Sequence, residues 1–304
     1  MASTLDSACD ILIDLVGKAC ARRPLRVAVV DPTDELSLAG ALAAQSAGLI
    51  EPVLVGDADA ILAAAQRGGH VIDAARIVHA AGDSARIAVA LAASGDVGAL
   101  MKGAIHSDVL LRAVVGEPRL RTERRISHVL ALEVPKLGRP LLLTDAAVNI
   151  APDLDAKRDI TQNAIDLAIA LGIPCPFTAI LSAAENVSQG RQSTLDAAAL
   201  SKMAQRGQII GGIVDGPLAL DDAVSEEAAQ AKGIESSVAG RADILVAPDL
   251  DSGNMIFKTL DWLAGARFGG LVCGARVPVI LTGRSDHTEA RVISCALAVL
   301  ASAP

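Results

Sequence analysis

The chain has 304 residues, a net charge of −8, 52% apolar residues and only 1% aromatic ones. This length allows two α/β domains or one large one. The acidic net charge argues against nonspecific nucleic-acid binding. No stretch holds the roughly 18 uninterrupted apolar residues of a membrane span. Because the mean hydropathy of +0.44 is high for a monomer, we expect apolar surface covered in a homo-oligomer, a dimer or larger.

Short β-type runs alternate with Ala-rich helical segments, which is the pattern of parallel βα units in an α/β fold. Asp34 and Asp57 each precede a helical segment and are expected to start it. Ser193 with Asp196 has the spacing of a capping box. The expected strands are Leu25–Val30, Pro52–Val55, Ala75–Val78, Val97–Met101, Pro140–Leu143, Phe177–Leu181, Gly212–Val214, Ile244–Val246 and Val277–Leu281.

One Arg-rich segment, residues 119–125, is the only marked shift in composition along the chain. It follows Gly116, Glu117 and Pro118, so we expect the chain to cross between domains there and to return near residues 269–275. The expected first α/β domain therefore comprises residues 1–122 plus 275–304, and residues 123–274 form a second, inserted α/β domain.

Several catalytic and cofactor motifs are missing. The sequence has no GxGxxG after the first strand, no P-loop, no HExxH and no GxSxG. Its five histidines lack metal-ligand spacing, so we predict no metal site. Its five cysteines form no Cys-x-x-Cys pair, which favours reduced thiols, mostly in the core, and a cytoplasmic location.

Polar residues gather where expected strands give way to helices, and ligands of open α/β sheets bind beyond such strand ends. The first junction is MKGAIHSD at 101–108, with Arg112 in the following helix. Glycine and a helix N-terminus there favour an anion. The alternative is that Ser107 or Asp108 only caps the helix while Lys102 is solvated.

The second junction, TGRSD at 282–286, follows the last expected strand. The planar fork of Arg284 suits phosphate or carboxylate, and the alternative is a surface ion pair with Asp286 or Glu289.

The third junction carries Asn254 and Lys258, which share a helix face and serve either a ligand or a solvated surface. The pentapeptide APDLD occurs twice, at 151–155 and 247–251. We expect its first aspartates to be helix caps rather than Mg²⁺ ligands.

Five long blocks in the later part of the chain are specific enough to indicate a family. The blocks are ISHVLALEVPKLGRPLLLTDAAVNIAPDLDAKRDITQNAIDLA, STLDAAALSKM, VDGPLALDDAVSEEAAQAKGI, SSVAGRADILVAPDLDSGNM and VPVILTGRSD. From about Val97 to the C-terminus, the chain resembles the phosphate acetyltransferase and phosphate butyryltransferase family. The butyryltransferase branch is the more similar, as is the phosphotransacylase module fused to enoyl-CoA hydratase in some bacteria. The resemblance implies a two-domain, isocitrate dehydrogenase-like α/β fold with mostly parallel sheets and an interdomain active-site cleft.

The resemblance also implies an acyltransferase that reversibly moves a short acyl group, butyryl or acetyl, between CoA and inorganic phosphate. Acyl-CoA, phosphate and acyl phosphate are then the partners, and CoA is a substrate rather than a permanently bound cofactor. The family's phosphoryl-contacting arginine corresponds to Arg284, and a second ligand-contacting arginine corresponds to Arg112. The family's strand-end residues correspond to Asp145, Asn149, Asp249 and Asn254.

Two positions depart from the family pattern. Gly283 replaces a serine, and Ala290 replaces the aspartate proposed as general base in the acetyltransferase branch. The expected catalytic residues are therefore Arg284, Asp286 and Glu289. The expected substrate-binding residues are Lys102, Gly103, His106, Arg112, Asp145, Asn149, Asp249, Asn254, Lys258, Thr282 and Gly283.

Two alternatives remain at the level of sequence. One is a noncatalytic or weakly active acyl-CoA- or phosphate-binding partner of an enoyl-CoA hydratase, which the departures at Gly283 and Ala290 favour. The other is a metal- and NAD-dependent dehydrogenase of the same fold, against which the missing metal-ligand spacing weighs.

Overall fold

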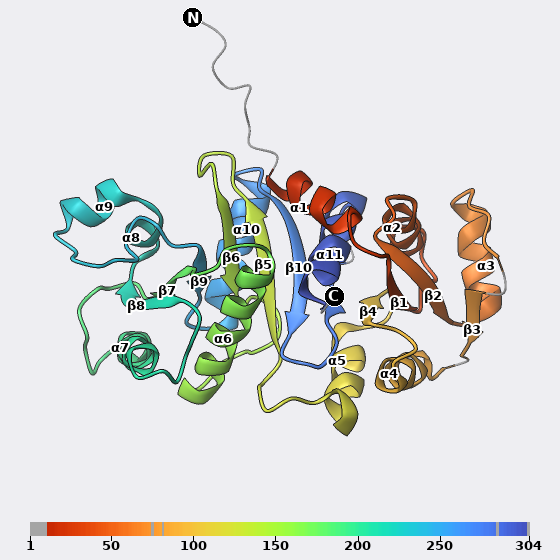
Figure 1. The fold of residues 1–304 in the computed structure, drawn as a ribbon, viewed down its shortest axis with the longest axis horizontal. Helices are drawn as coiled ribbons and strands as arrows, with labels where there is room; N and C mark the ends of the chain where they lie inside the picture. Colours follow the sequence, from red (N-terminus) through yellow and green to blue (C-terminus); the bar gives the residue numbers. More distant parts are fainter. Residues whose placement is uncertain (1–10, 74–75, 81, 284–285, 303–304) are drawn as a thin grey trace, which may run out of the picture. The chain divides into compact units, whose positions relative to one another are not determined.

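A computed structural model describes residues 11–73, 76–80, 82–283 and 286–302 of the chain (Figure 1). The chain divides into two compact units. The inserted unit is Arg125–Phe268 together with the described residues before Ile13, and the flanking unit is Ile13–Arg124 and Gly269–Pro304. The sequence had placed the two crossings at 122/123 and 274/275.

The flanking unit contains strands in the order β3-β2-β1-β4-β11-β10. Neighbours are parallel except β10 and β11. The strands are β1 (Leu25–Val30), β2 (Ile50–Gly56), β3 (Ile77–His79), β4 (Ala99–Lys102), β11 (Val279–Ile280) and β10 (Arg267–Cys273, from Gly269 onward in this unit). The helices are α1 (Ile11–Cys20, from Ile13 onward in this unit), α2 (Glu35–Ser46), α3 (Ala58–Arg67), α4 (Ser84–Ser94), α5 (Ser107–Gly116) and α11 (Thr288–Ala301), with a 3-10 turn, η2, at Pro118–Leu120.

Small and branched apolar side chains fill the core of the flanking unit. Val27 to Val30 of β1 are all fully buried, and Leu100 and Met101 of the adjacent β4 are equally inaccessible. Alanines on α2 and α4 let these helices lie close to the sheet, so a core almost without aromatic rings still excludes water.

The inserted unit contains strands in the order β5-β6-β9-β7-β8. Only β5 and β6 run antiparallel. The strands are β5 (Ser127–Glu133), β6 (Pro140–Thr144), β7 (Phe177–Leu181), β8 (Ile213–Leu218) and β9 (Ile244–Val246). The helices are α6 (Leu154–Ala170), α7 (Gln192–Gln205), α8 (Leu220–Val224), α9 (Glu226–Ala231) and α10 (Leu250–Trp262).

The α/β class and its mostly parallel strands are confirmed, with local corrections. Strands β1, β7 and β9 have the predicted bounds, and Asp34 and Asp57 cap α2 and α3 as expected. The predicted capping box is wrong, because α7 has Arg191 as its N-cap and begins at Gln192. Strands β5 and β10 were not predicted.

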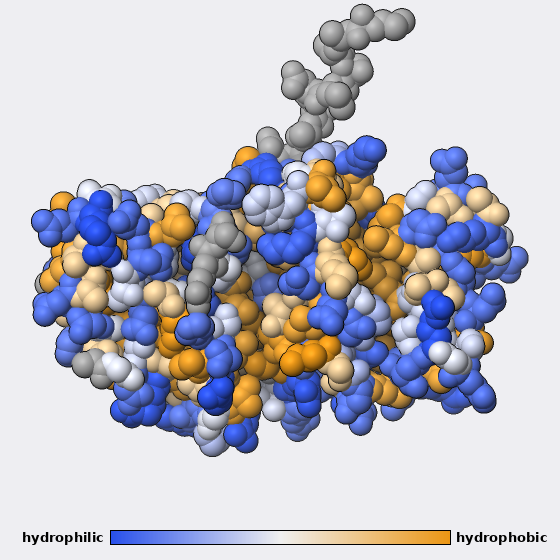
Figure 2. Space-filling model, turned by 180° about the vertical axis from the view of Figure 1, so that it is seen from behind, coloured by the Kyte–Doolittle hydropathy of each residue, from blue (hydrophilic) through white to orange (hydrophobic). Residues whose placement is uncertain are grey.

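Apolar residues are exposed in several places, and the hydropathy view from behind shows such patches on that face (Figure 2). The end of α10 exposes Trp262 at 74% and Leu263 at 83%. The cysteine prediction is partly wrong, since Cys20 and Cys175 are exposed while Cys295 is buried. Across the described residues, every helix is too short or too polar to cross a membrane.

Candidate active site

Two loops of the flanking unit lie side by side because β4 and β11 are neighbouring parallel strands. Lys102, the last residue of β4, is only 4% exposed. Its Nζ donates to the Gly103 carbonyl at 3.2 Å and to the Thr282 carbonyl at 3.4 Å. The alternative of a solvated Lys102 is therefore wrong, and its ammonium links the loop after β4 to the loop after β11.

Gly103 allows a third loop, the one after β1, to approach this pair. A Cβ at Gly103 would overlap the carbonyl oxygens of Val30 and Asp31, so no larger residue fits without a shift of backbone. The Gly103 amide donates to Val30 O at 2.8 Å, and the Ala104 amide donates to Asp31 O at 2.7 Å. These two amides are therefore used within the protein.

A second buried cation, which the sequence analysis missed, lies beside Thr282. Arg291 of α11 is 3% exposed. Its Nη1 donates to Thr282 Oγ1 at 2.7 Å and its Nη2 to the Gly283 carbonyl at 3.0 Å. Burial lowers the pKa of this guanidinium, while the charges of Asp286 and Asp34 act in the opposite direction.

The carboxylates near this cation are tied to backbone amides. Asp286, which precedes α11, accepts from the Gly283 amide at 2.6 Å. Burial raises the pKa of Asp34, but hydrogen bonds from Ser37 and the charge of Arg291 outweigh it, so the net shift is downward. Glu289 is exposed on the first turn of α11, and Arg284 lies outside the described residues.

Helices α5 and α11 both begin without a side-chain cap. Their N-cap residues are His106 and His287, and neither side chain accepts a first-turn amide hydrogen bond. A helix N-terminus of this kind presents N–H groups and partial positive charge to an anion. Arg112, further along α5, has a 77% exposed side chain and pairs with Asp108 at 3.0 Å.

The inserted unit uses its predicted polar residues to build a turn after β6. Asp145 accepts hydrogen bonds from the amides of Ala147, Val148 and Asn149. Asn149 Nδ2 also donates to Asp145 Oδ2 at 2.7 Å and to the Ile126 carbonyl at 2.9 Å. Both side chains are at least 94% buried, so this geometry holds the strand end in place.

Helix α10 brings the third predicted junction next to that turn. Asn254 Nδ2 donates to the Ala146 carbonyl at 3.3 Å. Lys258 Nζ pairs with Asp261 at 3.3 Å and lies 4.3 Å from the centre of the Phe257 ring. Asp249 accepts from the Ser252 amide at 2.8 Å, and Asp153 accepts from Ala156 at 2.8 Å, so the predicted helix caps are confirmed.

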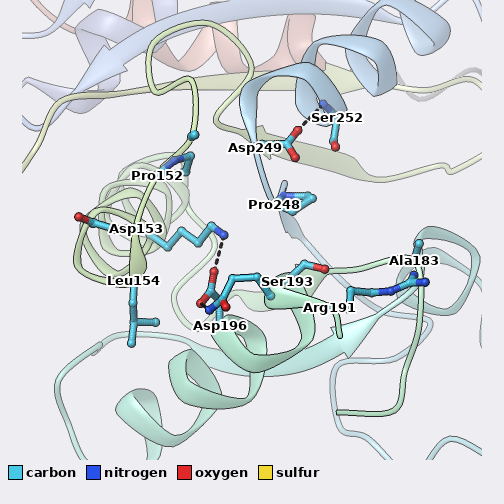
Figure 3. A pocket seen from close by; sticks show the side chains of 13 residues that line it. Pro152, Asp153, Leu154, Ala183, Arg191, Ser193, Asp196, Pro248, Asp249 and Ser252 are labelled. Carbon is cyan, nitrogen blue, oxygen red and sulfur yellow. Dashed lines mark hydrogen bonds and ion pairs between the residues drawn. The ribbon is translucent and has the colours of Figure 1, made fainter. Parts of the chain in front are cut away.

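A cavity of about 790 Å³ opens within the inserted unit where α6, α7 and α10 begin (Figure 3). Lys157 and Asp196 form an ion pair at 2.6 Å in its wall, with side chains 7% and 8% exposed. Gln192 donates to the other oxygen of Asp196 at 2.8 Å. The capping carboxylates of Asp153 and Asp249 also line the cavity, so the first-turn amides that they cap on α6 and α10 already have acceptors, whereas α7 begins without a side-chain cap.

The sequence analysis missed two features, and only one of them lacked a usable signal. The Lys157–Asp196 pair joins positions 39 residues apart with no local signal. Arg291, in contrast, is a lone cation on a helix whose neighbours Ile293 to Leu300 are all buried, and that placement was a usable signal. Among the described residues, no group of three His, Cys, Asp or Glu side chains is arranged to hold a metal ion.

The comparison with protein families identifies the chain's family. A family model described as phosphate acetyl/butaryl transferase matches residues 58–299. The chain belongs to this family.

Relatives of the chain within this family carry both names. A phosphate acetyltransferase from Rhizobium meliloti is 49% identical, over 95% of this chain and 92% of the relative. A phosphate butyryltransferase from Clostridium acetobutylicum is 41% identical, over 94% and 96%. The crystal structure of a branched-chain phosphotransacylase from Enterococcus faecalis V583 is 32% identical with a TM-score of 0.79, covering 91% of this chain and 98% of that one. The predicted family and fold class are confirmed.

Proposed function

We propose that this protein is a phosphate acyltransferase that reversibly transfers a short acyl group, butyryl or acetyl, between CoA and inorganic phosphate. Family membership supports the reaction. The observation that links the reaction to a site is that two buried cations contact Thr282, since Lys102 Nζ donates to its carbonyl at 3.4 Å and Arg291 Nη1 donates to its hydroxyl at 2.7 Å.

The proposed reaction is a direct acyl transfer. A phosphate oxygen attacks the thioester carbonyl carbon, the new C–O bond forms, the C–S bond breaks, and the CoA thiolate leaves and takes up a proton. In reverse, the CoA thiolate attacks the acyl phosphate and phosphate leaves. Holding both reactants in line supplies much of the rate, because the bimolecular entropy cost is met on binding.

The proposed phosphate contacts come from the loop after β11 and the start of α5. Arg284 is proposed to bind the phosphoryl group, with Thr282, Gly283 and the charge of Lys102 around it. On the α5 side, the proposal includes His106 and Arg112, with Gly103 as the residue that lets the loops approach. The two uncapped helix N-termini support an anion at this edge of the flanking unit.

A base is proposed to accept the CoA thiol proton. A free thiol has a pKa of about 8.5, so only a few per cent is thiolate at neutral pH. Asp286 and Glu289 are the proposed candidates. Asp286 Oδ2 already accepts from the Gly283 amide, so the two carboxylates are not equivalent. Asp286→Asn and Glu289→Gln distinguish them, because only the substitution of the residue that acts as the base is expected to remove the acidic limb of the pH–rate profile.

The strand-end residues of the inserted unit are proposed to contribute to substrate binding, directly or by holding the surrounding turns. They are Asp145, Asn149, Asp249, Asn254 and Lys258. CoA is proposed as a substrate rather than a resident cofactor. We also propose a cytoplasmic homo-oligomer, and exposed apolar residues such as Trp262 and Leu263 support the second part; light scattering after gel filtration tests it.

The decisive assay is CoA release from acetyl-, propionyl- and butyryl-CoA, with and without phosphate, in the presence of a chelator. Phosphate-dependent release that survives chelation is expected. CoA binding without phosphate-dependent release would favour the noncatalytic partner of an enoyl-CoA hydratase. A requirement for NAD and a divalent metal would favour the dehydrogenase instead.

Arg284→Ala is expected to lower phosphate-dependent turnover by roughly 10²- to 10³-fold, because one well-aimed donor to the developing charge is lost. Arg86→Ala is the matched control, since Arg86 is an exposed arginine on α4 of the same unit and pairs with Asp83, the N-cap residue of that helix. Thermal unfolding of both variants is expected to match the wild type. Wild-type turnover in Arg284→Ala would remove that arginine from the mechanism.

A further inference from the structure

The most unusual buried group in the flanking unit is the guanidinium of Arg291. It lies among apolar residues of α11 and contacts α2 at Gly40, where an added Cβ would overlap the Arg291 side chain. Replacing a buried charge by an apolar residue of similar volume is often neutral or stabilising. A need for core stability alone therefore does not account for an arginine at this position.

The hydrogen bonds of Arg291 point to two consecutive residues of one loop. Nη1 reaches the Thr282 hydroxyl at 2.7 Å, and Nη2 reaches the Gly283 carbonyl at 3.0 Å. The rigid fork of a guanidinium can fix two acceptors at once, which an ammonium on a flexible stem cannot do equally well. Nε has no hydrogen-bond partner among the described residues, so the polar contacts of this side chain are all made by the fork.

Thr282 is held from a second direction by Lys102. The Thr282 carbonyl accepts from Lys102 Nζ, while its hydroxyl accepts from Arg291, and the residue is only 3% exposed. Gly283, which follows it, is exposed; its amide donates to Asp286 and its carbonyl accepts from Arg291. The structure therefore clamps the last buried residue and the first exposed residue of this loop.

We propose that Arg291 is a positioning residue that holds the Thr282–Gly283 segment in the geometry needed to bind the phosphate substrate. The proposal rests on the proposed function for the identity of the ligand. It assigns Arg291 no contact with substrate, because the guanidinium is buried beneath the loop that it holds. Misplacing a substrate-positioning segment by about 1 Å can cost around 10²-fold in rate.

The test compares Arg291→Gln with Arg22→Gln, a matched substitution of an arginine that follows α1 and contacts the far end of α11. Arg22 Nη1 donates to the carbonyls of Val299, Leu300 and Ser302, so Arg22→Gln also removes bonds to α11 but lies away from the loop. Arg291→Gln is expected to raise KM for phosphate roughly 10- to 100-fold while KM for acyl-CoA stays within about twofold. Arg22→Gln is expected to leave both KM values unchanged.

Two further measurements separate positioning from simple loss of structure. Arg291→Lys is expected to recover part of the phosphate KM, because an ammonium can reach one of the two acceptors. Thr282→Val removes the hydroxyl but keeps the side-chain shape. In a double-mutant cycle of Arg291→Gln with Thr282→Val, the free-energy change derived from the phosphate KM of the double variant is expected to be smaller than the sum of the two single changes. Equal changes in both KM values, or full additivity, would overturn the proposal.

A readout independent of turnover distinguishes this inference from the proposed reaction. Amide hydrogen exchange of Thr282 and Gly283 is expected to accelerate in Arg291→Gln and to remain as in the wild type in Arg22→Gln. If the wild type releases no CoA in response to phosphate but exchange responds in this way, the reaction is wrong and the positioning role stands. Unchanged exchange in a folded Arg291→Gln protein would show that Arg291 does not hold the loop.

Discussion

The junctions that lead into α6 and α10 of the inserted unit differ electrostatically from those that lead into α5 and α11 of the flanking unit. In the inserted unit, Asp153 and Asp249 cap α6 and α10, and Asp196 neutralises Lys157. In the flanking unit, α5 and α11 begin without a side-chain cap, and Lys102 and Arg291 are buried beneath the adjoining loops. A helix N-terminus whose amides already serve a carboxylate offers little to an anion. Strand ends of similar topology therefore differ in what they can bind.

The largest expected effect tests the balanced charges of the inserted unit. Lys157→Met leaves the buried carboxylate of Asp196 without its partner, so the free energy of unfolding should fall by about 3–5 kcal/mol in chemical denaturation. Lys202→Met, at an exposed lysine of α7, is the control and should change stability by less than about 0.5 kcal/mol. The double variant Lys157→Met with Asp196→Leu should recover most of the loss, and failure to recover would mean that the pair is not the cause.

A smaller effect is expected at the two helix caps. Asp153→Ala and Asp249→Ala each remove an acceptor of a first-turn amide, and each should lower the free energy of unfolding by about 1 kcal/mol. Steady-state kinetics then separate the two. A change in KM for Asp249→Ala but not for Asp153→Ala would support the proposed contribution of Asp249 to substrate binding, whereas an unchanged KM in both variants would limit both carboxylates to helix capping.

The smallest expected effect probes the interior of α11, below the flanking edge. Burial raises the pKa of Cys295 from 9.0 to about 12, despite the nearby charge of Arg291. The native thiol keeps its proton at pH values where the unfolded thiol loses it, so raising the pH above 9 favours unfolding. The loss from this group should be just under about 1 kcal/mol at pH 9.5, and it should be absent in Cys295→Ala.

Alkylation gives an independent check on that environment. At pH 8, iodoacetamide should label the exposed Cys20 and Cys175 in the native protein and reach Cys295 only after denaturation. Rapid native labelling of Cys295 would mean that the helix is less tightly packed than the structure indicates.

The parallel part of the fold was readable from the sequence because its signals are local. Strands β1, β7 and β9 are short apolar runs followed by a helix, and the caps at Asp34 and Asp57 use the residue type that competes best for first-turn amides. Strand β5 escaped because all its residues are buried, polar Ser127 and His128 included, which hides the alternation. Strand β10 escaped because two glycines interrupt it.

The candidate site was readable only where it follows strand ends. Lys102, Thr282 and Gly283 stand out in sequence because a polar or glycine residue directly follows an apolar run. Sequence patterns do not show that Lys102 reaches a carbonyl 180 residues away, or that Asp286 serves its own turn. Such contacts depend on which strands become neighbours, and strand order is a tertiary property.

The pairing of β4 with β11 also sets the order in which the molecule can assemble. Leu100 lies opposite Val279, and the entire inserted unit separates them along the chain. During synthesis, strands β1 to β4 emerge long before β11, which pairs with the open edge of β4. That edge of β4 therefore stays unpaired until the inserted unit has been made. Closure of such a distant contact is slow, and a strand edge that stays open in the meantime is exposed to aggregation.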